Sequence, residues 1–284
     1  SKLDVSFQPY VALAAWVLGR PARICYSRGE SMRASTKRHP SDIRLAVGCD
    51  ETGRISGFVF DGIFNTGAYA SWGPTVANRV PIHASGPYVT KDYRANSVAV
   101  HTNAPPAGAF RGFGVPQSAV AQECAFDLLA EKLGMDRLAF RRLNALKNGV
   151  PTVTGQVFNS GVGIDDCFAA LEDSWHAAVT SAASFNQTAI SDNSPWRKGV
   201  GIASCWYGCG NTSLPNPSTM RMGITADGRI VLHQGAMDIG QGANTVITQI
   251  AADALGIPVH DVVILGGDTD LTPDCGKTSA SRQT

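Results

Sequence analysis

One segment combines glycines with an arginine and aromatic residues in a spacing that suits ligand binding. Residues Ala107–Gln117 read AGAFRGFGVPQ, and their three glycines let the backbone come close to a ligand. Arg111 supplies fixed hydrogen-bond donors, and Phe110 or Phe113 supplies a flat apolar face. Such a loop suits a planar ligand with polar edges. The alternative is a tight turn whose aromatic side chains belong to the core.

A second candidate segment, Met237–Thr245 (MDIGQGANT), lies between an expected strand and an expected helix. Gly240 and Gly242 flank Gln241 just before the helix begins, so backbone N–H groups and the positive end of the helix dipole gather at one point. This arrangement favours a phosphate or pyrophosphate. The segment has neither a Walker GK[ST] element nor a GxGxxG fingerprint, and a simple glycine-bearing turn is the alternative.

A third segment, Gly266–Thr284, ends in nine residues that are almost all small or hydrogen-bonding. Together with Lys277 and Arg282, these residues could wrap an anionic cofactor. They could equally form a solvated loop, so this segment decides little by itself.

Other familiar catalytic patterns do not occur in the sequence. It contains no HExxH, GxSxG or CxxC motif, which removes the usual sequence support for zinc hydrolysis, an α/β-hydrolase triad and thiol redox chemistry. No protein ligand to a metal is predicted. No catalytic role is assigned to the isolated histidines or to the acidic residues without a recognisable partner, namely His83, His101, His233, Asp4, Glu30 and Glu123.

The composition narrows the classes of partner. With 24 basic and 23 acidic side chains, the charge is too balanced to indicate nucleic acid or an anionic membrane. No apolar run approaches the roughly 20 residues of a membrane-spanning helix, and the first residues lack a secretory pattern. We therefore expect a cytoplasmic protein, or a periplasmic one if a segment upstream carries an export signal.

The seven cysteines are scattered and odd in number, which argues against a disulfide framework or an iron–sulfur cluster in this chain. They are expected to be reduced thiols. Any redox centre must therefore be contributed by another group.

Hydrophobic spacing predicts a mixture of helices and strands. Apolar residues at helical spacing predict a helix over residues 10–17 capped by Ser6, and further helices over 126–133, 137–145, 164–178 and 247–254. Strand-like runs occur at Ala22–Ser27, Asp42–Gly48, Ile55–Ile63, Val200–Tyr207, Thr219–Thr225, Ile230–Gln234 and Val262–Leu265. The turn at Asp227–Gly228 is typical of a hairpin.

The order of these elements predicts an α+β fold in two halves. Residues 1–150 are expected to form the first half, residues 151–195 a linker with an irregular segment rich in Ser, Thr, Asn and Ala, and residues 196–284 part of the second half.

The motifs, taken together and in order, resemble those of the large subunit of the molybdenum hydroxylases, which include xanthine dehydrogenase, aldehyde oxidase and aldehyde oxidoreductase. The resemblance covers nearly the whole chain. It is carried by the AFRGFGVPQ loop and by the segments Glu123–Asp136, Arg141–Asn144, Gly240–Gly242 and Thr272–Ser281. It implies two mixed α/β halves of a molybdopterin-binding domain.

The resemblance also implies a molybdenum–molybdopterin cofactor, in plain form or as the cytosine dinucleotide, which is held without direct protein–metal bonds. The residues expected to bind it are Phe110, Arg111, Gly112, Ile239, Gly240, Gln241, Gly242, Ser279, Ala280, Ser281 and Arg282. Phe113 matches the aromatic residue that packs on the substrate ring, and Arg79 matches an arginine that polarises the substrate in purine oxidisers.

The activity implied by this family is hydroxylation of an aldehyde or N-heteroaromatic compound with oxygen from water, while electrons leave through [2Fe–2S] clusters on another domain or subunit. A FAD subunit and an oligomer are further expectations. Leu3 stands where purine oxidisers carry a glutamate, which favours aldehydes. The sequence does not reach the Gly-x-Gly-Glu loop that supplies the family's essential glutamate, so the chain alone is expected to be inactive.

Two alternatives stay open at this point. A thioester reductase of the same family would use the same cofactor in the reductive direction. A catalytically incomplete fragment or binding module is the other alternative, although such a scaffold has no physical need for Arg111, Phe113 and Gln241 together. Carbon monoxide oxidation is disfavoured, because the loop Phe110–Gly114 lacks that branch's cysteine.

Overall fold

The computed structural model describes residues 5–208 and 217–279. The chain divides into two compact units between Tyr207 and Gly208, and each unit has its own core. Leu3, Asp4 and residues 280–284 lie outside the described residues, so the expectations for Leu3, Ala280, Ser281 and Arg282 concern parts that the structure does not describe.

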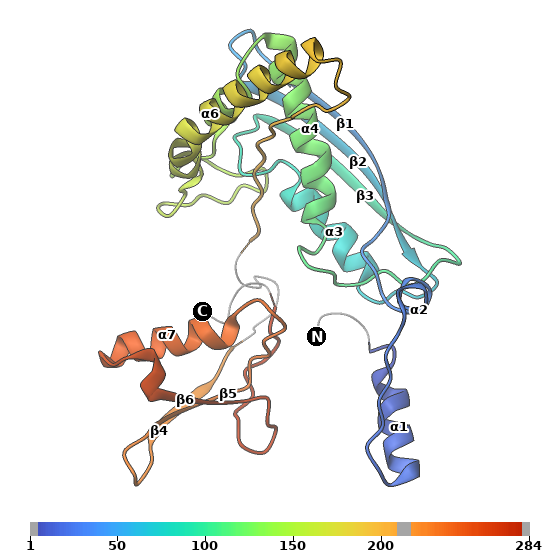
Figure 1. The fold of residues 1–284 in the computed structure, drawn as a ribbon, viewed down its shortest axis with the longest axis vertical. Coiled ribbons are helices and arrows are strands. Elements are labelled where there is room, and N and C mark those ends of the chain that lie inside the picture. Colours follow the sequence, from blue (N-terminus) through green and yellow to red (C-terminus); the bar gives the residue numbers. More distant parts are fainter. Residues whose placement is uncertain (1–4, 209–216, 280–284) are drawn as a thin grey trace. The chain divides into compact units, whose positions relative to one another are not determined.

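The first unit is built on a three-stranded sheet of order β1-β2-β3, formed by Ser41–Cys49, Ile55–Gly67 and Asp92–His101. The first two strands are antiparallel, and β3 runs parallel to β2 after a crossover through helix α3 (Gly73–His83). Helix α4 (Val115–Leu133) packs on β1, while α3 packs on β2 and β3 (Figure 1). The strands predicted over 42–48 and 55–63 are therefore confirmed.

Phenylalanine side chains fill the space between this sheet and its helices. Strand β2 is buried at alternating positions because successive side chains point to opposite faces of a sheet. A side chain at Gly62 would collide with the rings of Phe60 and Phe64, since a Cβ atom there would lie 2.7 Å from Phe64 Cε2. The fully buried aromatic residues of this core include Phe58, Phe60, Phe64, Phe126 and Phe140.

Helix α4 is fixed to helix α5 (Arg137–Asn144) by a buried ion pair. Arg141 is completely buried, and its Nε donates to Glu123 Oε2 at 2.7 Å. The Tyr88 hydroxyl donates to the other oxygen of Glu123 at 2.9 Å, and Ser204 Oγ donates to that hydroxyl at 2.7 Å. Burial raises the pKa of Tyr88, and the nearby Glu123 carboxylate adds to this shift. Glu123 therefore has a structural partner that the sequence did not reveal.

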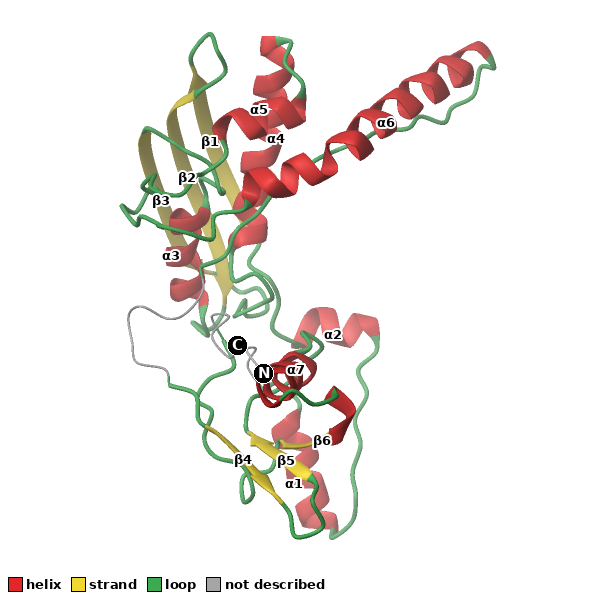
Figure 2. Cartoon of the chain, turned by 90° about the vertical axis from the view of Figure 1, so that its left-hand side faces the viewer, coloured by secondary structure: helices red, strands yellow, loops and turns green. Residues whose placement is uncertain are grey.

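Helix α6 (Ile164–Ser191) corrects the prediction for residues 151–195. A helix was expected only to residue 178, with an irregular segment beyond it, but a single helix of 28 residues runs through this region (Figure 2). Its alanines favour a helix despite the many Ser and Thr residues. Its buried side chains recur at intervals of seven residues and form one stripe along the helix, namely Phe168, Trp175, Ala182 and Ala189.

The N-terminal region also differs from the prediction. Helix α1 (Gln8–Leu18) is present, but Phe7 rather than Ser6 precedes it and no side chain caps it. The strand expected at Ala22–Ser27 does not form. Instead, Ser27 and Glu30 form a capping box that begins helix α2 (Arg28–Ala34). None of the helices within the described residues is both long and apolar enough to cross a bilayer.

The second unit repeats the strand–strand–helix–strand order of the first. Strands β4 (Met220–Ile224) and β5 (Ile230–Gln234) are antiparallel, and β6 (Val262–Gly266) runs parallel to β5 after helix α7 (Ala243–Leu255) and a 3₁₀ turn, η1 (Val259–Asp261). These strands and the predicted turn at Asp227–Gly228 are confirmed, and Gly228 takes a positive φ of 82° in the hairpin. The run Val200–Tyr207 is not a strand.

The ion pair of Arg141 predicts that substituting Arg141 lowers the free energy of unfolding far more than substituting its neighbour Arg142. Replacing Arg141 by Ala leaves the Glu123 carboxylate buried without its counter-charge, and we expect a loss of about 3–5 kcal/mol in the free energy of unfolding. Arg142 pairs with Asp165 and Glu172 at the surface, so Arg142→Ala should cost far less. Urea unfolding of the full chain measures both changes, and similar losses for the two variants would contradict this account.

Candidate functional site

Hydrogen bonds from two distant segments hold the loop that follows β3. Ala107 N donates to Thr66 O at 2.9 Å, and Gly108 N donates to Lys37 O at 3.0 Å. Lys37 N in turn donates to Pro106 O at 3.0 Å, so residues 37 and 107 form a short parallel bridge. The loop therefore leaves the sheet region at a fixed position before it enters α4.

The tip of this loop has an unusual backbone. Phe113 has a positive φ of 46°, which costs a non-glycine residue roughly 1–3 kcal/mol and persists only where the surroundings enforce it. Gly114 has a φ of 97°, and a Cβ atom there would lie 2.6 Å from Val80 Cγ2 of α3. The loop is thus pressed against α3, and this close approach requires glycine.

The predicted loop residues present both charge and apolar surface. Phe110 is 37% exposed, and the Phe113 ring lies edge-on to Trp72 with a centroid distance of 6.2 Å. The Arg111 side chain is exposed and makes no hydrogen bond or ion pair with any residue in the ranges 5–208 and 217–279. A free guanidinium in a loop that also carries two phenylalanines suits a planar ligand with an anionic edge.

Arg79 lies on α3, the helix against which this loop packs. Its Nε is buried and has no hydrogen-bond partner within the described part of the chain. Its guanidinium carbon lies 5.4 Å from the Tyr207 ring, which also stacks on His83 at 5.2 Å. Burial lowers the pKa of His83, and the neighbouring Arg79 charge acts in the same direction. Arg79 thus has an unused donor, the feature expected of a group that meets a ligand.

In the second unit, an aspartate occupies the donors predicted for a phosphate. Asp238 Oδ1 accepts from Gly240 N at 2.8 Å and from Gly242 N at 3.3 Å, while Oδ2 accepts from Asn244 N at 3.1 Å. These backbone N–H groups hold the pKa of Asp238 below its usual value. A phosphate at this turn must therefore use other donors or displace the carboxylate.

The Gln241 side chain folds back on its own loop. Its Oε1 accepts from Ile239 N at 2.7 Å, and its Nε2 donates to Met237 O at 2.8 Å. Ile239 is 54% exposed. A Cβ atom at Gly240 or Gly242 would meet nothing within 4 Å, so the space around these glycines is open to a ligand.

The third segment lies beside this turn. Thr278 Oγ1 accepts from Met237 N, and Cys275 Sγ accepts from Gly235 N, both at 2.9 Å. Ser279 is the last described residue, and its backbone N donates to Lys277 O at 2.9 Å. The predicted site residues are therefore gathered in two groups, with Arg79 and Phe110–Phe113 in the first unit and Ile239–Gly242 and Ser279 in the second.

The structure adds neighbours that the sequence did not single out, among them Arg38, Trp72 and Asp238. Asp238 carried no clear signal, because Gly242 occupies the N-cap position of α7 and Asp238 reaches the helix start only by accepting from Asn244 N. Arg38 and Trp72 carried none, since their roles depend on contacts with residues far along the chain. Among the described residues, no three His, Cys, Asp or Glu side chains gather as metal ligands.

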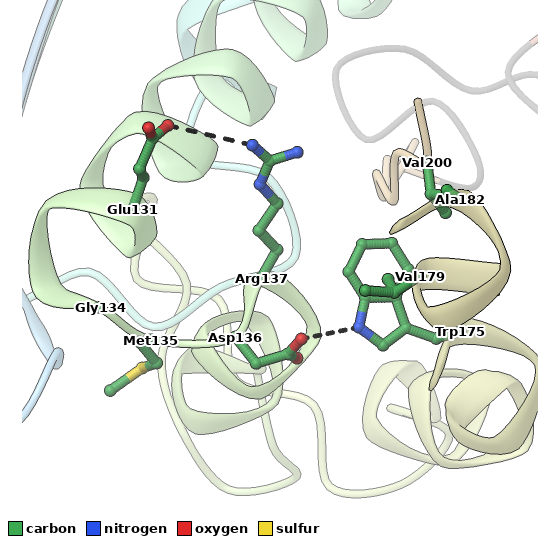
Figure 3. Close-up of a pocket in the computed structure, with 9 residues that line it drawn as sticks. All are labelled: Glu131, Gly134, Met135, Asp136, Arg137, Trp175, Val179, Ala182 and Val200. Carbon is green, nitrogen blue, oxygen red and sulfur yellow. Dashed lines mark hydrogen bonds and ion pairs between the residues drawn. The ribbon is translucent and has the colours of Figure 1, made fainter. Parts of the chain in front are cut away.

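A surface pocket of about 430 Å³ lies elsewhere in the first unit, where the turn between α4 and α5 meets α6 and Val200 (Figure 3). In it, Trp175 Nε1 donates to Asp136 Oδ2 at 2.8 Å. Burial opposes ionisation of Asp136, but this bond and one from Ala139 N outweigh it and lower the pKa of Asp136. None of the predicted site residues lines this pocket, and its polar groups hold helices together.

Comparison with known families assigns the chain to a class. Two family models described as molybdopterin cofactor-binding domains match residues 1–145 and 169–284. The chain therefore belongs to the molybdopterin cofactor-binding family of the xanthine dehydrogenases and aldehyde oxidoreductases. This confirms the family, the α+β fold of two mixed halves and the molybdopterin cofactor that the motifs predicted. The dinucleotide form of the cofactor and the roles of individual residues stay predictions.

Three individual proteins illustrate the similarity. A Bacillus subtilis protein described as a probable subunit of xanthine dehydrogenase is 33% identical over the whole chain, which spans 37% of that protein. The large molybdopterin subunit of nicotinate dehydrogenase from Eubacterium barkeri is 42% identical over 57% of the chain and 38% of that subunit. The solved aldehyde oxidoreductase of Desulfovibrio gigas is 29% identical over 99% of the chain and 30% of that structure, with a TM-score of 0.82.

Buried histidines predict how stability depends on pH. His39 is 3% exposed, and burial together with the Arg38 charge lowers its pKa. The unfolded chain then binds more protons than the folded one just below the ordinary histidine pKa, so the free energy of unfolding should fall as pH drops below about 6.5.

We expect His39→Leu to reduce this slope, which is at most about 1.4 kcal/mol per pH unit for one proton. Unfolding of the full chain by urea between pH 7.5 and 5.5 measures it. His260→Leu is the matched control, since His260 is exposed. An unchanged slope in His39→Leu would show that His39 makes no contribution.

Proposed function

We propose that this chain supplies cofactor loops and part of the substrate pocket of a molybdenum-dependent oxidoreductase. The reaction proposed is hydroxylation of an aldehyde or an N-heteroaromatic ring with oxygen derived from water. The observation that carries the proposal is the exposed Arg111 side chain without a hydrogen bond or ion pair among the described residues, in a loop that also carries Phe110 and Phe113 and in a stretch matched as a molybdopterin cofactor-binding domain. Relatives named for nicotinate and aldehyde oxidation support these two substrate classes.

The described residues fit a pterin cofactor with a phosphate group. In the first unit, Arg111 offers a cation, and the Phe110 ring, which is 37% exposed and has Arg38 over it, offers apolar surface. In the second unit, Gly240 and Gly242 leave open space, although Asp238 takes the nearby N–H groups. We infer that Gln241 turns outward when it binds the cofactor, because its amide now bonds only to its own loop.

When bound, the molybdenum cofactor supplies a two-electron oxidation of the substrate carbon. The protein's part is to position the substrate. Phe113 offers an aromatic face for a planar ring, and Arg79 offers a donor toward an oxygen or nitrogen on which negative charge develops. The Phe113 ring packs edge-on against Trp72, and this contact orients the ring before substrate arrives.

We further propose that the electrons leave through [2Fe–2S] clusters, and then FAD, on other domains or subunits within an oligomer. The relatives named as subunits support a multi-component enzyme. The cytoplasm is the proposed location.

The full-length protein should therefore oxidise aldehydes or nicotinate-like rings when an artificial electron acceptor is supplied. With a nicotinate-like ring as substrate, the hydroxylated product formed in ¹⁸O-labelled water should carry one labelled oxygen, and mass spectrometry measures it. Unlabelled product, or activity only in the reduction of a thioester, would contradict the hydroxylase assignment.

The proposed role of Arg111 predicts that its substitution lowers the amount of bound pterin. We expect Arg111→Gln to lower bound pterin by about tenfold, which corresponds to the loss of one charge-assisted hydrogen bond. Arg94→Gln is the control, because Arg94 is an exposed arginine of the same unit with only a 3.8 Å ion pair to Asp61. Pterin released by acid and measured by fluorescence decides between them, and equal pterin contents in the two variants would remove Arg111 from the cofactor site.

A further inference from the structure

Residues 35–40, which connect α2 to β1, run beside the Ala107–Gln117 loop. The loop follows this segment by about seventy residues in the sequence. Lys37 exchanges backbone hydrogen bonds with Pro106 and Gly108, each at 3.0 Å. His39 O accepts from Gln117 Nε2 in the first turn of α4 at 3.2 Å. The segment therefore contacts both ends of the loop.

Arg38 lies between these two points and contacts the tip of the loop. Its Nη2 donates a hydrogen bond to the backbone oxygen of Arg111. Its guanidinium carbon lies 4.7 Å from the centre of the Phe110 ring, within the range of a cation–π contact. Its Nη1 donates a longer bond to Gln117 Oε1 at 3.4 Å. One planar guanidinium thus joins the ring, the main chain and the helix start.

These contacts use properties that only arginine combines. Two donors in a rigid plane reach two acceptors while the face of the same plane rests on an aromatic ring. Within residues 5–208 and 217–279, no carboxylate lies within ion-pair distance of Arg38. Its guanidinium therefore forms no surface ion pair, and its hydrogen bonds and its cation–π contact are with the loop and with α4.

We propose that Arg38 is a positioning residue for the cofactor loop: it fixes the Phe110 ring and the main chain at Arg111, so that the Arg111 side chain stands ready for an anionic ligand. The fixing of the loop follows from this chain's own contacts. The effect on cofactor and catalysis rests on the function proposed above.

Hydrogen exchange of the full-length protein tests the first part without reference to activity. The amides of Phe113 and Val115 bond to Phe110 O and Gly112 O within the loop, so they report its order. Arg38→Met keeps an apolar stem over the ring but removes the donors, and we expect these amides to exchange about tenfold faster. Arg38→Lys restores one donor and should give an intermediate rate. Arg44→Met, at an exposed position on β1, is the matched control.

Unchanged exchange in Arg38→Met, or the same increase in Arg44→Met, would overturn the proposal. If Arg38→Met does not fold, Arg38→Lys alone decides, because wild-type exchange rates in it would also overturn the proposal. Faster exchange together with lower bound pterin, partly rescued in Arg38→Lys, is the full expected result. Faster exchange with unchanged pterin would keep the positioning of the loop and contradict the cofactor role of the loop, which belongs to the proposed function.

Discussion

The guanidinium of Arg141 is fully buried and forms its ion pair with Glu123 at 2.7 Å, in the interior where helices α4 and α5 meet. A buried charge is tolerated only when its partner and its remaining hydrogen bonds are in place. The pair therefore fixes where α4 lies relative to α5, and the hydrogen bonds of Tyr88 and Ser204 to Glu123 tie two further segments to it. Since α4 begins at Val115, this pair fixes the helix that the Ala107–Gly114 loop enters, while bonds to Thr66 and Lys37 hold the other end of the loop.

The loop before this helix carries residues of the candidate site. Gly114 lets the chain approach α3 closely, and Phe113 takes a backbone conformation that few residues adopt. The result is an aromatic ring, a free guanidinium and a nearby unpartnered donor at Arg79, all in one unit. The second unit supplies a different surface, an open glycine turn whose N–H groups are occupied by Asp238.

Much of the fold and the family could be predicted from the sequence, because strand periodicity, turns and motifs are local properties. Strands such as Ile55–Ile63 and the glycine that ends α4 follow from periodicity and turn chemistry. The full length of α6 could not, because a single window does not show which helix surface will be buried. The segment Ala22–Ser27 could not either, because a β-prone run forms a strand only where a neighbouring strand pairs with it.

The contacts that organise the site were also beyond the sequence. Glu123 and Arg141 are eighteen residues apart on different helices, and Arg38 meets Arg111 from seventy-three residues away. No motif spacing encodes such pairs. The motifs predict which loops bind the cofactor, whereas the structure shows what holds one of these loops in place.

The most direct test is the ratio of molybdenum to pterin in the full-length protein, purified from a host that makes the cofactor. Elemental analysis and pterin fluorescence on one sample supply the two numbers. About one molybdenum and one pterin per polypeptide is the result that this account predicts. A folded full-length protein that carries neither would contradict the claim that these loops bind molybdopterin.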